Sequence, residues 1–265
     1  MKKTNPKEKN EDFFIITNIA KEVLSDYNFS IYIIGSIAYG DFIKGVSDID
    51  FMLIFEEELN ENIFSAIKKF VKILKESTDT KFDAVFLSEN QVDIGKNQEN
   101  KVIYYNDAVL KYDNNCGNIS PVNWLELKTV GIKLCGKDIS LNINTTIDDV
   151  LDYAYENINS YWVNWSHKLA DSNFILTEEE VAWCVLGISR LIYVIENKKL
   201  CSKTVAGLYA KERFGNQYED IIDSALLVRQ NKPIIIDSSY KEKISSYLNM
   251  CINIYNVKYN KIESL

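Results

Sequence analysis

Two aspartates, Asp48 and Asp50, are separated by a single residue and follow a Gly-Ser pair, Gly35 and Ser36, in the stretch GSIAYGDFIKGVSDID. If the aspartates lie on a strand, both carboxylates project from the same face, because side chains alternate along a strand. Two carboxylates that close repel each other unless a proton or a cation lies between them. A hard divalent ion such as Mg²⁺, which takes oxygen ligands and holds substrate phosphates, would relieve that repulsion.

The Gly-Ser pair supplies groups that a phosphate needs. A strand that leads through a small loop into a helix exposes backbone N–H groups, which bind phosphates well. Gly35 lets the backbone approach a phosphate closely, and Ser36 adds a hydroxyl donor. Either motif alone is most often a solvated turn or strand end. A third carboxylate, Asp83, lies within another apolar stretch, where an unpaired acid is costly. Together these features indicate phosphoryl or nucleotidyl transfer.

Short apolar runs around these residues are the strands that must position them. SIYII at 30–34, IDFMLIF at 49–55 and KFDAVFLSE at 81–89 are rich in β-branched and aromatic residues. Apolar residues at helical spacing predict helices at 11–27 and 60–75. The motif therefore lies between two strands of a sheet that helices cover.

The pattern is weaker between 90 and 146. KVIYY at 101–105 is a candidate strand, and the turn-rich YDNNCGN at 112–118 indicates a connection. Pro121, at a favourable first helical position, predicts a helix over 121–132.

The second half of the chain has a different character, with no convincing strand. Its apolar spacing predicts helices at 147–169, 177–197, 203–213, 216–229 and 239–260. We therefore place a boundary near 140–146. The predicted fold class is α+β followed by α: an N-terminal α/β domain with a mixed sheet, residues 1–143, and an all-helical C-terminal domain, residues 144–265.

The composition of the chain limits the classes of partner that we expect it to bind. A net charge of −8 argues against nucleic acid, whose phosphates require clustered Lys and Arg, and suits a cationic small molecule. The chain opens with a polar, basic stretch that lacks the apolar segment of a signal peptide. Its longest apolar-rich stretch, 181–195, is too short to span a bilayer. Five scattered cysteines and one histidine argue against a zinc site. We expect a cytoplasmic protein with reduced thiols and no membrane partner.

The opening motif resembles the GS-x(10–12)-D-x-D signature of the DNA polymerase β-like nucleotidyltransferase superfamily. Farther along, VAWCVLGISRLIYVIENKKLCSKTVAGLYAKERF and YEDIIDSALLVR look like the C-terminal helical domain of the spectinomycin/streptomycin adenylyltransferases. VGIKLCGKDI, at the expected domain junction, is also typical of that group. The resemblance implies that the first domain is a nucleotidyltransferase domain and that the helical domain completes the cleft for ATP and the acceptor.

The resemblance assigns roles to residues of the first domain. Ser36 and Ser47 match positions that contact the nucleotide triphosphate, and Asp48 and Asp50 match the metal ligands, which implies Mg²⁺ as the cofactor. Asp83 matches a glutamate that acts as catalytic base. Because its side chain is one methylene shorter, Asp83 can serve instead as a metal ligand, as in the polymerases, and the sequence leaves both roles open.

It also assigns roles in the helical domain. Arg190 and Lys203 match basic residues that bind ATP, and Glu180 matches an aspartate near the bound aminocyclitol. Arg190 interrupts an apolar helix, where a cation is costly unless paired. The alternative is therefore a structural ion pair with Glu180 or Asp223.

The resemblance implies transfer of AMP from ATP to a hydroxyl of an aminocyclitol or aminoglycoside antibiotic, which confers resistance. Spectinomycin is favoured over streptomycin, because Tyr104 and Tyr105 stand in the region where the streptomycin-modifying members have a tryptophan. The partners would be ATP and a cationic acceptor, and a monomer suffices. One alternative is a nucleotidyltransferase of the toxin–antitoxin type that acts on a protein or a tRNA 3′ end. Another is a non-catalytic nucleotide-binding module.

Overall fold

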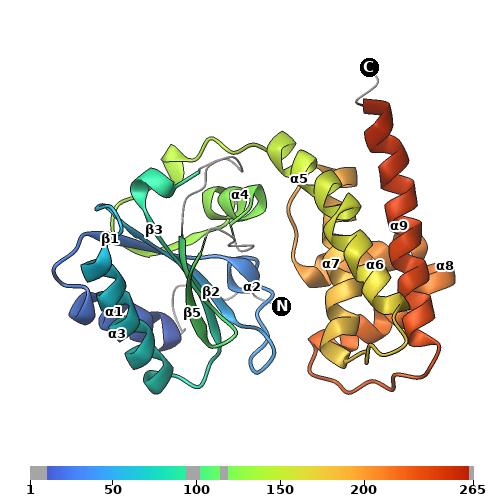
Figure 1. Cartoon of the computed structure of the whole chain (residues 1–265), viewed down its shortest axis with the longest axis horizontal. Helices are drawn as coiled ribbons and strands as arrows, with labels where there is room; N and C mark the ends of the chain where they lie inside the picture. The colour runs from blue at the N-terminus through green and yellow to red at the C-terminus, as the bar shows by residue number, and fades with distance from the viewer. Residues whose placement is uncertain (1–10, 94–101, 114–118, 263–265) are drawn as a thin grey trace. The chain divides into compact units, whose positions relative to one another are not determined.

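The computed structural model describes residues 11–93, 102–113 and 119–262. The chain divides into two compact units, Met1–Thr146 and Ile147–Leu265 (Figure 1). The first unit contains a six-stranded sheet with helices, and the described residues of the second contain helices alone. The predicted fold class is confirmed.

The sheet of the first unit has the strand order β5-β4-β3-β2-β1-β6. Its strands are β1 Phe29–Ile33, β2 Ile49–Phe55, β3 Phe82–Ser88, β4 Val102–Asn106, β5 Val109–Asp113 and β6 Ile132–Cys135. Only the central pair, β2 and β3, is parallel, and the other four described pairings are antiparallel. The crossover between β2 and β3 runs through a helix, as a parallel connection requires.

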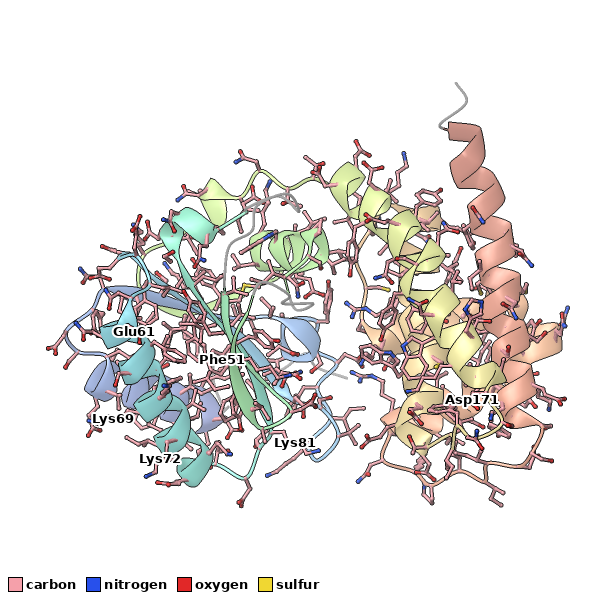
Figure 2. All side chains as sticks on the ribbon, in the orientation of Figure 1. Phe51, Glu61, Lys69, Lys72, Lys81 and Asp171 are labelled. Atoms are coloured by element: carbon pink, nitrogen blue, oxygen red, sulfur yellow. The ribbon has the colours of Figure 1, made fainter. Side chains whose placement is uncertain are left out.

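Two helices, α1 (Glu11–Val23) and α3 (Glu61–Ser77), pack on one face of the sheet (Figure 1). The α3 helix begins at Asn60, whose side chain accepts hydrogen bonds from the backbone N–H groups of the first turn. Phe51, labelled in Figure 2, lies in this layer and contacts Phe70 and Phe86 edge-on. Lys69 and Lys72 extend from the exposed side of α3 (Figure 2).

The opposite face of the sheet is covered by α4 (Pro121–Thr129), whose Trp124 and Leu127 pack with Met52 and Ile54 of β2. Three short elements complete the unit: α2 Gly35–Ala38, and the 3₁₀ turns η1 Glu89–Gln91 and η2 Ser140–Asn142. The side chains of the central strands therefore alternate between two apolar layers, as the period of a strand requires.

The second unit, as far as residue 262, is built from five helices. These are α5 Ile147–Asn159, α6 Tyr161–Ala170, α7 Glu178–Asn197, α8 Lys203–Arg229 and α9 Tyr240–Ile262. Buried residues of all five contribute to one apolar cluster. Trp162 packs against Gly187 of α7, where a Cβ would lie 2.6 Å from the indole ring. None of the described helices has the length and apolar character needed to cross a membrane.

Several element boundaries differ from the sequence-based predictions. The helix expected over 121–132 ends at Thr129, and the strand β6 follows it. Strand β5 includes the beginning of the stretch interpreted as a connection, the rest of which lies outside the described residues. The helix expected over 147–169 is two helices that meet at Ser160. The helices expected at 203–213 and 216–229 are one helix, α8, with a kink at Tyr218.

Four cysteines are free thiols: Cys135, Cys184, Cys201 and Cys251. The fifth, Cys116, lies outside the described residues.

Candidate active site

The parallel pairing of β2 and β3 aligns two of the candidate carboxylates. Asp50 of β2 is paired in register with Asp83 of β3. The residues next to Asp50 and Asp83 along their strands face the layer formed with α1 and α3. Asp50 and Asp83 themselves lie on the opposite face, with Met52 and Val85, which pack toward α4. The negative charge of Asp48 acts on Asp83, which places the first aspartate of the pair near the same point. The structure thus gathers Asp48, Asp50 and Asp83 at one end of one face of the sheet.

Gly35 joins the Gly-Ser motif to the aspartates. The Ile34 N–H donates to the Asp50 carbonyl at 3.0 Å, so the chain leaving β1 runs beside β2. Gly35 then adopts a φ of +64°, in the left-handed region that glycine tolerates best. A Cβ at this position would lie 2.7 Å from Cγ of Asp50 and closer still to Oδ2. A glycine is therefore required here by the carboxylate that it faces.

We expect Gly35→Ala to displace the Asp50 carboxylate and to lower turnover by at least about tenfold. The left-handed backbone and the close contact should also cost about 1–3 kcal/mol of unfolding free energy. Denaturant unfolding measures the second effect, and nucleotide turnover of the folded variant measures the first. Gly45→Ala is a matched control, because Gly45 also has a positive φ but no atoms within 4 Å of its would-be Cβ. Equal turnover in the two variants would contradict the prediction.

The serines of the motif differ in their local bonding. The hydroxyl of Ser36 is buried and has no hydrogen-bond partner among the described residues, as expected of a hydroxyl that hydrogen-bonds to a bound ligand. Its helix, α2, is a single turn of four residues. The Ser47 hydroxyl accepts a hydrogen bond from the Ile43 N–H at 3.1 Å and shapes the loop before Asp48. A triphosphate contact by Ser47 stays a prediction.

The surroundings of Asp83 shift the pKa of its carboxyl in opposite directions. Burial raises the pKa of its carboxyl above the ordinary value, a hydrogen bond from Asn106 lowers it, and the charges of Asp48 and Asp107 raise it. The net shift is upward. A carboxylate with a raised pKa in a polar cluster is suited to accept a proton.

Asn106 was not identified from the sequence, although it directly contacts a candidate residue. Its Nδ2 donates to Oδ2 of Asp83 at 2.9 Å. The available signal was its position two residues after Tyr104 in an alternating strand, because every second residue of β4 shares a face. The cross-strand register that brings it to Asp83 is not visible in the local sequence.

The donor set of Asp48 and Asp50 fits a magnesium ion. Mg²⁺ binds few protein carboxylates and completes its octahedron with waters and substrate phosphates. Among the described residues, no group of three or more His, Cys, Asp and Glu side chains is placed to hold a metal ion. Asp83 lies beside the pair, in register with Asp50. Its roles as base and as metal ligand both stay predictions.

The candidate residues of the second unit lie on α7 and at the start of α8. Arg190 donates from Nε to the carbonyl of Cys201 at 3.2 Å, two residues before Lys203. The ammonium of Lys203 lies 5.1 Å from the ring centroid of Trp183. Both cations are thus associated with the turn that leads into α8. Their role in binding ATP stays a prediction.

Glu180, the predicted acceptor contact, stabilises the start of α7. Its Oε2 accepts from the Thr177 N–H at 2.9 Å in a capping box, and Oε1 lies 3.5 Å from Lys168. Asp223, the other carboxylate considered for Arg190, accepts two hydrogen bonds from Lys211 at 2.8 Å. Glu180 therefore has an evident structural role, and its acceptor contact stays a prediction.

The fold and the carboxylate arrangement agree with a family comparison. Residues 16–110, from within α1 to the start of β5, match the family described as nucleotidyltransferase domain. The chain therefore contains a nucleotidyltransferase domain of the polymerase β-like type, as the sequence motif predicted.

The wider fold is similar to that of a solved structure, spectinomycin adenyltransferase AAD(9) from Enterococcus faecialis with ATP and spectinomycin. The identity is 14%, the TM-score is 0.70, and the match covers 92% of this chain and 98% of that one. At this identity the similarity shows a shared fold. A second structure, the STING-associated CdnE c-di-GMP synthase from Capnocytophaga granulosa, is 15% identical over 98% of this chain and 90% of that one, with a TM-score of 0.30. That score is too low to support an argument. No curated protein sequence matches the chain.

Proposed function

We propose that this nucleotidyltransferase transfers AMP from ATP to a hydroxyl of a cationic aminocyclitol or aminoglycoside, with spectinomycin as the first acceptor to test and resistance as the consequence. The observation that carries the proposal is the in-register pairing of Asp50 with Asp83 on one face of the sheet, with Gly35 against the Asp50 carboxylate. The similarity in fold to a spectinomycin adenyltransferase supports the choice of acceptor.

The residues of the site divide the work of an in-line displacement. Asp48 and Asp50 would hold Mg²⁺, which when bound neutralises charge on the phosphates. The Ser36 hydroxyl donates to a phosphate oxygen. Asp83 accepts the proton of the acceptor hydroxyl while the oxygen of that hydroxyl bonds to the α-phosphorus. The bond from that phosphorus to the bridging oxygen breaks, and pyrophosphate leaves with the electron pair.

The acidic character of the site suits a cationic acceptor. Asp48 and the exposed Asp107 act on Asp83, which is paired in register with Asp50, in a chain whose net charge is −8. A field of one sign concentrates ligands of the opposite sign and repels a polyanion such as tRNA. We therefore place a small cationic acceptor ahead of a nucleic acid.

The decisive experiment incubates the protein with ATP, Mg²⁺ and a panel of aminocyclitols and aminoglycosides, and follows pyrophosphate release and the mass of the acceptor. Addition of AMP to one antibiotic supports the proposal. Modification of a protein or a tRNA 3′ end, with every antibiotic unchanged, would replace it with the toxin–antitoxin alternative. Tight ATP binding without any pyrophosphate release would identify a non-catalytic nucleotide-binding module.

A further prediction concerns the second unit. We expect Arg190→Ala and Lys203→Ala each to weaken ATP binding or slow transfer by about 1.5–3 kcal/mol, the range for hydrogen bonds to charged groups. Titration calorimetry with ATP and turnover kinetics provide the measurements. Lys199→Ala is the matched control, because Lys199 is an exposed lysine in the same α7–α8 turn. If Arg190→Ala mainly lowers the melting temperature and the folded fraction binds ATP normally, Arg190 has a structural role.

A further inference from the structure

The hairpin between β4 and β5 ends beside the candidate base. Strand β4 ends at Asn106, which pairs with Val109 of β5 across a turn of two residues. Asp107 and Ala108 in this turn have φ values of 50° and 61°. Two successive left-handed residues characterise the type I′ turn, whose twist matches that of the flanking strands. Such a tight turn fixes the position of Asn106 relative to the sheet.

The register of the sheet then places Asn106 opposite Asp83. Strands β3 and β4 are antiparallel, with Ala84 paired to Tyr105 and Val85 to Tyr104. One further step along this register brings Asp83 to Asn106. The hydrogen bond from Nδ2 to Oδ2, at 2.9 Å, joins the two side chains on the face that also bears Asp50.

The amide at position 106 offsets a local repulsion. The negative charges of Asp48 and Asp107 both act on Asp83. Like charges at short range push a carboxylate toward other rotamers or toward solvent, unless a donor holds it. An asparagine provides that donor without adding a further charge, whereas an aspartate at position 106 would add one. Asn106 thus anchors one oxygen of Asp83.

We propose that Asn106 is a positioning residue for nucleotidyl transfer: it holds Oδ2 of Asp83 so that Oδ1 is presented to the acceptor hydroxyl. The described residues provide no second hydrogen bond to Asp83, so Oδ1 remains available for that proton. This inference rests on the proposed function, because it assigns Asp83 the role of base. It adds a residue on β4 to the machinery supplied by β2 and β3.

The first test replaces the amide with an apolar side chain of similar size. In Asn106→Leu, we expect kcat to fall by about 10- to 100-fold, as for loss of a hydrogen bond to a charged group, with KM for ATP changed by less than about twofold. Asn106→Asp should lose at least as much, because it replaces the donor with a third repelling charge. The same changes at Asn62, an exposed residue at the start of α3 on the other face, should leave both constants unchanged.

An exchange of the two side chains separates positioning from simple stabilisation. The double variant Asp83→Asn/Asn106→Asp keeps one amide and one carboxylate across the same strand pair. We expect its melting temperature to recover relative to Asn106→Asp while transfer stays lost, because the carboxylate now extends from β4. Recovery of transfer in the double variant, or a normal kcat in folded Asn106→Leu, would overturn the proposal.

A measurement that does not depend on turnover tests the contact itself. The side-chain amide resonances of Asn106, followed by ¹⁵N NMR in the whole protein, should shift strongly in Asp83→Ala and little in Asp79→Ala. Absence of the shift would overturn the proposed contact. If the shift occurs but the wild-type protein transfers AMP to no acceptor, the proposed function fails and Asn106 loses its assigned role. If the wild type is active and Asn106→Leu is equally active, this inference alone fails.

Discussion

Asp50→Asn is expected to reduce nucleotidyl transfer by about a thousandfold or more, because a metal ligand contributes several kcal/mol of transition-state stabilisation. The melting temperature should stay the same or rise slightly. Asp50 lies in register with Asp83 and two residues from Asp48, so the neutral amide relieves repulsion among three carboxylates in the protein without metal. Pyrophosphate release and thermal unfolding, measured on the same preparation, check the two parts.

The control for this variant is Asp79→Asn, which removes an exposed carboxylate from the turn before β3. It changes the net charge by the same amount and should leave turnover unchanged. A calorimetric titration with magnesium, in the presence of a non-hydrolysable ATP analogue, should show weaker metal binding in Asp50→Asn but not in Asp79→Asn. Near-normal turnover in Asp50→Asn would remove the carboxylate pair from the mechanism.

The central strands could be predicted from the sequence because their own residue composition indicates a strand. Strands β1, β2 and β3 are short, apolar runs rich in β-branched and aromatic residues, and all their ends in the structure lie within one residue of the expected positions. Helices α3 and α7 were predicted for a similar reason, since their apolar residues follow the helical period.

The edge strands were missed because their signal is not local. Strand β6 has only four residues, all partly exposed, and it directly follows a helix. It is a strand because Ile132 pairs with Ile33 of β1, about a hundred positions earlier in the chain. Strand β5 is likewise formed by pairing with β4 across a tight turn. Tertiary pairing of this kind overrides local propensity.

In the candidate site, too, some residues could be predicted from the local sequence and others depend on tertiary pairing. The Gly-Ser and Asp-x-Asp motifs could be identified because their chemistry depends on short spacings along the chain. The run that contains Asp83 was expected to be a strand, and the structure places this strand beside β2, with Asp83 in register with Asp50. Asn106 could not be found in this way, because its relation to Asp83 depends on the register between β3 and β4. The steric reason for glycine at position 35 also emerges only when Asp50 is placed against it.

Asp83→Asn is expected to lose transfer severely, by at least about 100- to 1,000-fold, while the variant still binds ATP. The site keeps the Ser36 hydroxyl and the Asp48–Asp50 pair, which the proposed mechanism assigns to the nucleotide. Stability should not fall at neutral pH. The folded-state pKa of Asp83 is raised, so the folded protein loses stability as pH increases through that pKa, and a neutral amide avoids this loss. Calorimetric ATP binding, turnover and thermal unfolding measure the three properties.

Asp83→Glu then separates the two roles that the sequence left open. A base must come within hydrogen-bond distance of a hydroxyl or reach it through one water, which a side chain longer by one methylene can still do. A ligand of Mg²⁺ must hold an oxygen at about 2.1 Å in an octahedral arrangement, which tolerates displacement poorly. Because the proposed mechanism assigns Asp83 the role of base, we expect Asp83→Glu to keep measurable transfer and an unchanged magnesium requirement. A large rise in the magnesium concentration needed for turnover would instead identify Asp83 as a metal ligand, and normal turnover in Asp83→Asn would exclude both roles.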